Sequence, residues 1–60
     1  MYTKKVSSKR DAKRIATRLI DSSVRYEVTP LPEDEYEFGV RRDVAHVLDK
    51  IFIDLIVKDL

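Results

Sequence analysis

The spacing of the apolar residues constrains the fold of this chain more than any other feature. It changes along the sequence between the alternation that is typical of a strand and the repeat of three and four residues that is typical of an amphipathic helix. These changes come in the order strand, helix, strand, strand, helix. Residues that favour turns or helix caps separate the segments, so the sequence predicts one βαββα domain that spans residues 1–60.

The N-terminal part of the chain predicts a strand followed by a helix. Residues 2–6 alternate weakly, which is typical of a strand. Ser8 then has the position of a helix N-cap, and Asp11 follows three residues later as the acidic member of a capping box. Residues 21–23 are turn formers that end the helix. The apolar residues of this helix recur at helical spacing: Ala12, Ile15, Ala16, Leu19 and Ile20.

Two further strands are predicted over residues 24–29 and 36–41, because apolar and polar residues alternate in both segments. Pro30 and Pro32 are expected to stop the first of these strands and to open a stiff acidic loop. The two strands then form a hairpin. Gly39 falls on the outer face of the second strand, where it is expected to mark a bulge or a close backbone approach.

The order of the elements predicts the sheet. A right-handed crossover makes the first two strands parallel, and the hairpin makes the third strand antiparallel to the second. The most economical sheet puts the third strand in the middle and both helices on one face. This α+β two-layer sandwich resembles a ferredoxin-like layout that lacks its final strand. The missing strand leaves the edge of the first strand unpaired, so Lys4 and Lys5, or another subunit, are expected to protect it.

The last helix is predicted to begin after Asp43, as its N-cap, and to run from Val44 nearly to the end of the chain. Its apolar residues form one broad face: Val44, Ala45, Val47, Leu48, Ile51, Phe52, Leu55 and Ile56. Ile53, Val57 and Leu60 fall roughly opposite the centre of that face. They could meet a partner, be buried by a tilted helix, or be scattered exposed aliphatics. Their alignment favours an intermolecular contact, and a homodimer is the default form.

The length of 60 residues permits only a thin core, and domains of this size usually need a disulfide, a metal or a partner chain. The chain has no cysteine, which excludes disulfides and thiolate metal sites, and its single histidine, His46, does not make a zinc site. Oligomerisation is therefore the expected stabilising device. The charged N-terminus and the short apolar runs predict a cytoplasmic protein that does not enter a membrane.

The net charge of +1 conceals an uneven distribution. Residues 1–25 hold eight Lys or Arg and two Asp, whereas residues 26–60 hold four Lys or Arg and nine Asp or Glu. The first helix carries the candidate binding residues of the basic half: Arg10, Lys13, Arg14 and Arg18. They could contact an acidic protein surface, nucleic-acid phosphates or only water. A pI near 8.0 and the lack of an RNA-binding aromatic signature count against nucleic acid.

A second charged cluster, the acidic residues Glu33, Asp34, Glu35 and Glu37, surrounds the predicted hairpin loop. These carboxylates could hold a cation weakly, meet the basic helix of a second chain or keep the loop soluble. They lack the spacing of a calcium loop.

No catalytic signature is present. His46 has no nucleophile or carboxylate partner nearby in the sequence, and a chain with one glycine cannot readily build a phosphate-binding loop. The sequence therefore predicts no enzyme, cofactor, metal site or small-molecule substrate. It predicts a small non-enzymatic interaction module, a homodimer that acts as a regulator or inhibitor by binding another protein. The alternative is a nucleic-acid-binding module that uses the first helix.

Overall fold

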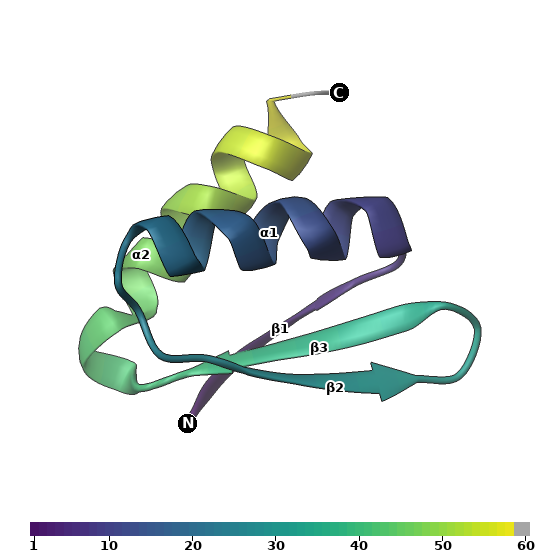
Figure 1. The fold of residues 1–60 in the computed structure, drawn as a ribbon, viewed down its shortest axis with the longest axis horizontal. Coiled ribbons are helices and arrows are strands. Elements are labelled where there is room, and N and C mark those ends of the chain that lie inside the picture. Colours follow the sequence, from purple (N-terminus) through teal and green to yellow (C-terminus); the bar gives the residue numbers. More distant parts are fainter. Residues whose placement is uncertain (59–60) are drawn as a thin grey trace.

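The computed structural model describes residues 1–58. Its elements follow one another along the chain as β1 (Tyr2–Val6), α1 (Lys9–Asp21), β2 (Glu27–Leu31), β3 (Glu35–Val40), the 3₁₀ turn η1 (Arg42–Val44), α2 (Ala45–Phe52) and the π turn η2 (Ile53–Val57). Both helices lie on the same side of a three-stranded sheet with the order β1-β3-β2 (Figure 1). The predicted α+β fold and the central position of the third strand are confirmed.

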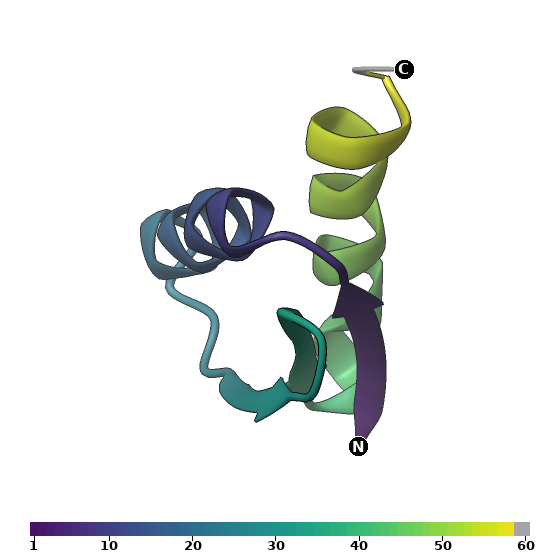
Figure 2. The same ribbon diagram turned by 90° about the vertical axis from the view of Figure 1, so that its right-hand side faces the viewer.

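The register of the sheet shows which side chains face the helices. Phe38, on the central strand, pairs with Lys4 of β1 on one side and with Val28 of β2 on the other, and both pairings are antiparallel. Residues directly opposite each other in a ladder share one face of the sheet. Figure 2 shows α1 nearly end-on and α2 upright beside β1, with the sheet curving beneath them. Within residues 1–58 no helix lies on the other face of the sheet.

The start of α1 follows the predicted capping box. The Ser8 hydroxyl accepts a hydrogen bond from the backbone N–H of Asp11 at 3.2 Å, and the helix ends at Asp21 as expected. The predicted apolar stripe is wrong at one residue, because Ile20 is 62% exposed. It lies in the last turn of α1, where the chain already turns away through Ser22 and Ser23, so no other element covers it.

The core lies between the inner face of the sheet and the two helices. Its buried residues come from four elements: Val6, Ala12, Ile15, Leu19, Phe38, Val40, Leu48 and Ile51. The ring of Tyr26 packs edge-on against Phe38, with 5.9 Å between the ring centroids. Within residues 1–58 no polar or charged side chain is buried, so the interior contains no internal polar site.

The boundaries of the hairpin strands differ from the prediction. β2 begins at Glu27 rather than at residue 24, and it continues through Pro30, which pairs with Tyr36 in the ladder. Pro30 was expected to stop the strand because a proline cannot donate to a ladder. β2 is an edge strand, however, and an edge strand tolerates a proline whose nitrogen faces away from its neighbour.

The single glycine marks a close approach rather than a bulge. Gly39 pairs with Thr3 on one side and with Glu27 on the other without a break in either ladder. A Cβ atom at this position would lie 2.5 Å from the sulfur of Met1, which lies across the outer face of the sheet here. Met1 therefore covers the only glycine of the chain.

The last helix also starts and ends differently from the prediction. Asp43 lies inside η1 and forms an exposed ion pair with Arg41 at 3.4 Å, and no side chain caps α2. The predicted N-cap is therefore wrong, because the 3₁₀ turn makes Val44 the residue that precedes α2 and leaves Asp43 one position too early. At the other end the α-helix stops at Phe52, and η2 continues it with wider π geometry, closed by a 2.9 Å hydrogen bond from the Lys58 N–H to the Ile53 carbonyl.

Candidate interaction surfaces

The C-terminal helical segment extends beyond α1 on the side away from the sheet (Figure 1). None of the five residues of η2 is buried, although all but Asp54 are apolar. Ile53 is 47% exposed and Val57 is 57% exposed. We refer to these two residues as the C-terminal patch. Leu60, the third residue predicted at this surface, lies outside the described residues.

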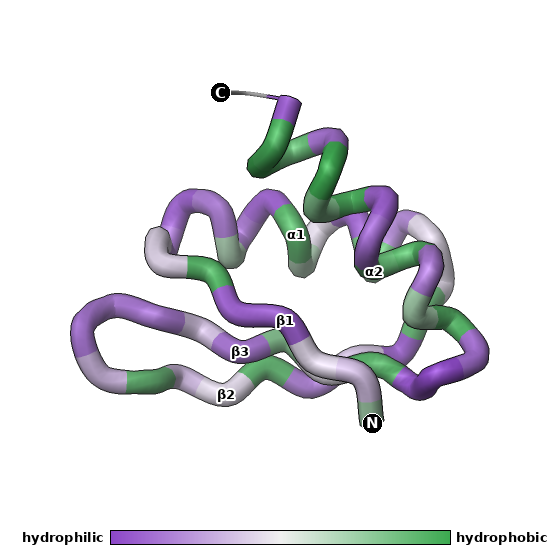
Figure 3. Tube along the Cα trace, turned by 180° about the vertical axis from the view of Figure 1, so that it is seen from behind, coloured by the Kyte–Doolittle hydropathy of each residue, from purple (hydrophilic) through white to green (hydrophobic). Residues whose placement is uncertain are grey.

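The broad apolar face of the last helix is covered unevenly. Leu48 and Ile51 are buried in the core, whereas Leu55 and Ile56, one turn further on, are only half-buried against it. The sheet and α1 therefore cover the start of the helix better than its end. Figure 3 shows hydrophobic residues continuing along the C-terminal helix after it has passed α1.

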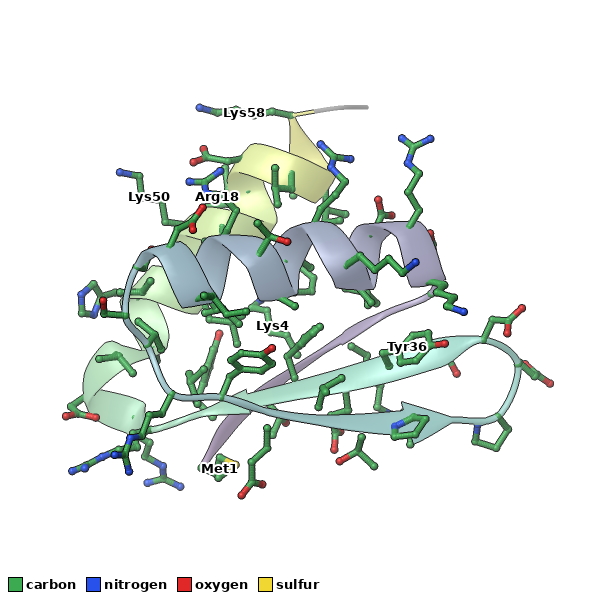
Figure 4. The ribbon with its side chains drawn as sticks, in the orientation of Figure 1. Met1, Lys4, Arg18, Tyr36, Lys50 and Lys58 are labelled. Atoms are coloured by element: carbon green, nitrogen blue, oxygen red, sulfur yellow. The ribbon has the colours of Figure 1, made fainter. Side chains whose placement is uncertain are left out.

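Ion pairs hold the C-terminal helix to α1 and leave two lysines beside the patch. Arg18 lies 3.6 Å from the Asp54 carboxylate, and Lys58 lies 3.5 Å from the other oxygen of the same group. In Figure 4, Arg18 points from α1 toward the C-terminal helix, while Lys50 and Lys58 point outward from it. Both lysines are exposed. The C-terminal patch is thus an apolar strip with a cationic border.

The four basic residues predicted on α1 do not form one uniform surface. Arg10 and Lys13 are exposed, whereas Arg14 and Arg18 are half-buried. Arg14 lies 3.5 Å from Asp11 within the helix, and Arg18 is engaged with Asp54. Internal ion pairs reduce the charge that a helix face offers to phosphates. The basic row that the sequence suggested is therefore partly neutralised within the chain.

A shallow hollow of about 290 Å³ lies on the surface between α1 and η2. Arg14, Thr17 and Arg18 line it on the α1 side, and Leu55 lines it on the η2 side. The hollow is small and contains no nucleophile paired with a base, so it has no chemistry of its own.

A cluster of polar side chains joins β1 to α2. The Tyr2 hydroxyl donates a hydrogen bond to Asp49, and the Lys4 ammonium lies 3.4 Å from the same carboxylate oxygen. The Tyr2 hydrogen bond and the nearby Lys4 lower the pKa of Asp49, while the contact with the Asp49 carboxylate raises the pKa of Tyr2. Both shifts favour an anionic Asp49 and a neutral Tyr2, which is the combination that the hydrogen bond requires.

Lys4 does not serve the role that the sequence suggested for it. It was expected to protect the open edge of β1, but its ammonium lies 5.3 Å from the centre of the Phe52 ring, within range of a cation–π contact. Its side chain thus contacts α2 and does not extend into solvent at the edge of β1. No local pattern predicts this cluster, because its members are 47 residues apart at the widest.

The residues that could support chemistry are not brought together. His46 is exposed on α2 and has no hydrogen-bond or ion-pair partner within residues 1–58. No group of three or more metal-ligating side chains occurs in that part of the chain. Over the same residues, neither helix combines the length and the hydropathy that a bilayer crossing requires.

The comparisons with known proteins give no family to this chain. No protein-family model matches the sequence, and no curated protein or solved structure matches it either.

Proposed function

We propose that this chain is a small, non-enzymatic protein-interaction module of the cytoplasm that self-associates as a homodimer through its C-terminal patch. In this form it regulates or inhibits a macromolecular partner. The observation that carries the proposal is η2, a helical turn with four apolar residues and none of them buried. A short domain gains stability when a second chain covers such a surface.

The proposed occupant of this surface is a second copy of the chain. The chain has a net charge of only +1, so two copies meet without strong mutual repulsion. Lys50 and Lys58 lie at the border of the patch, where they remain hydrated when the apolar strips of two chains meet. A twofold arrangement also buries Ile53 and Val57 of both chains in a single contact.

Nucleic-acid binding through α1 is the weaker candidate. Arg14 and Arg18, two of the four basic residues that it would use, already lie beside Asp11 and Asp54. No observation on the sheet favours nucleic acid either, because Tyr26 and Phe38 pack on each other rather than forming an open stacking platform.

The experiment that tests the proposal is the molar mass of the chain in solution over a dilution series at two salt concentrations. We expect the mass of two chains at high concentration and a shift toward one chain on dilution. The shift should be nearly the same at about 0.1 M and about 0.5 M salt, because salt screens charges but does not weaken apolar contacts. A folded monomer at every concentration would contradict self-association.

A further inference from the structure

A second apolar surface lies on the opposite side of α1 from the C-terminal helix. α1 packs mainly over β1 and β3, and four of the five residues of β2 are exposed. Val28 is on the inner face of the sheet, directly across the ladder from the buried Phe38, yet it is 45% exposed. Together with α1 this open strand forms a hollow of about 200 Å³, which we call the α1–β2 groove.

The floor of the α1–β2 groove is apolar. Val28, Tyr36 and Phe38 supply it from the hairpin, and Figure 4 shows the Tyr36 ring on the side of β3 that faces α1. Ala12 and Ala16 form the apolar part of the helical wall, one turn apart. Small residues on this wall allow another element to approach α1 closely.

The rim of the groove is cationic. Lys9 and Lys13 lie one turn apart on α1 and line the groove, and no carboxylate lines it. Neither lysine has an ion-pair partner within residues 1–58, in contrast to Arg18. Two unpaired lysines of the basic helix therefore lie beside exposed apolar surface.

We propose that the α1–β2 groove docks an acidic amphipathic helix of another protein. Its aliphatic residues would cover Val28 and the half-buried Ala16, and its carboxylates would meet Lys9 and Lys13. Such a helix would extend the helical layer beside α1 and complete the cover of the sheet. This surface is distinct from the C-terminal patch, so the inference goes beyond self-association.

The partner segment is a helix rather than an added strand because of the prolines of the hairpin. Pro30 lies within β2, and Pro32 is the first residue after the end of β2 at Leu31. Neither residue has a backbone N–H to donate, so the free edge of β2 cannot extend the sheet with a regular ladder. Docking by a helix requires no backbone hydrogen bonds from the edge and uses only the apolar floor and the rim.

The charges around the C-terminal patch indicate that the partner is a different protein rather than a second copy. Ile53 and Val57 lie beside Lys50 and Lys58, and Asp54 between them is already paired with two cations. Docking that end of a second copy into the groove would bring lysines toward Lys9 and Lys13. An acidic helix from elsewhere brings carboxylates instead.

The test is a titration of the isotope-labelled chain, followed by amide chemical shifts, with a synthetic helical peptide of about 15 residues, a length at which an isolated helix becomes marginally stable. The peptide carries leucines at helical spacing and glutamates elsewhere. One control peptide replaces the leucines by alanine, a second replaces the glutamates by lysine, and a single-stranded RNA oligonucleotide is titrated separately. We expect the largest shifts at the groove residues and at least tenfold weaker binding for either control peptide.

Variants of the chain make the test specific. Val28→Glu and the double substitution Lys9→Glu and Lys13→Glu should each weaken peptide binding at least tenfold, and the second should also remove its salt dependence. The matched control is Ile20→Glu, at a 62% exposed isoleucine near the far end of α1, which should bind within twofold of the unchanged chain. The double lysine variant keeps the test valid if Val28→Glu disturbs the fold, because both lysines are exposed.

Four results would overturn the proposal. These are equal binding of the lysine peptide, unchanged binding by the groove variants, tighter binding of the RNA at the same residues, or a loss of self-association in Val28→Glu. The last would show that a second copy occupies the groove. None of these results except the last bears on the C-terminal patch, so the two proposals can fail separately.

Discussion

We expect the double substitution Ile53→Asp and Val57→Asp to separate the two chains into folded monomers and to raise the dissociation constant at least 100-fold. About half of each side chain is exposed in the single chain, so a twofold contact buries four half-exposed side chains. At about 1.5–3 kcal/mol for each fully buried aliphatic, this burial contributes roughly 3–6 kcal/mol. A factor of 100 corresponds to about 2.7 kcal/mol. The carboxylates would add a desolvation cost.

The measurement is sedimentation equilibrium, with circular dichroism as a check of the fold. The control is Ile20→Asp, which places one carboxylate at an isoleucine that is 62% exposed but belongs to α1. It should leave the dissociation constant within a factor of two. Equal weakening by the control and by the double substitution would mean that added charge, and not the patch, separates the chains.

The second large effect is expected on stability. Phe38→Ala should lower the free energy of unfolding by about 3–5 kcal/mol, because Phe38 is 1% exposed at the centre of the sheet. A domain of 60 residues has a total stability of roughly 3–9 kcal/mol at 0.05–0.15 kcal/mol per residue. The substitution therefore removes at least about a third of that stability, and all of it at the lower end of the range.

The control for this prediction is Val28→Ala, directly across the ladder from Phe38. Val28 is 45% exposed, so its truncation should cost no more than about 1 kcal/mol, near the centre of the distribution for ordinary substitutions. Urea unfolding followed by circular dichroism measures both variants. A Phe38→Ala chain with a nearly unchanged midpoint would mean that the core does not depend on the central strand.

The parts of the fold that local sequence determines were predictable. The N-cap at Ser8 and the alternation over residues 2–6 predicted the start of α1 and the first strand, and both are confirmed. The exposure of Ile53 and Val57 also followed from helical spacing alone. Side chains on the far side of a two-layer sandwich have no layer to cover them, whatever the details of packing.

The wrong predictions for Pro30 and Ile20 have a common physical origin, because both depend on which elements are neighbours in the folded chain. Pro30 can belong to a strand only because β2 is at the edge of the sheet, which is a property of the strand order. Ile20 is exposed because no element covers the last turn of α1. Burial of a residue at the end of a helix depends on the neighbouring elements as well as on its angular position.

The candidate surfaces were predictable only in part for the same reason. The sequence aligns Arg10, Arg14 and Arg18 along one side of α1 but does not show that Asp54 is within reach of Arg18. Only the lateral position of α1 over β1 and β3 leaves Val28 open beside Lys13 and creates the groove.

The most direct test of the central claim is a filtered nuclear Overhauser experiment on an equimolar mixture of isotope-labelled and unlabelled chains, which detects only contacts between different chains. The account predicts contacts from the methyl groups of Ile53 and Val57 to the C-terminal helix of the other chain. It would be contradicted by a mixture that shows no contacts between chains at concentrations where the mass is that of two chains, or by contacts that come from Val28 instead.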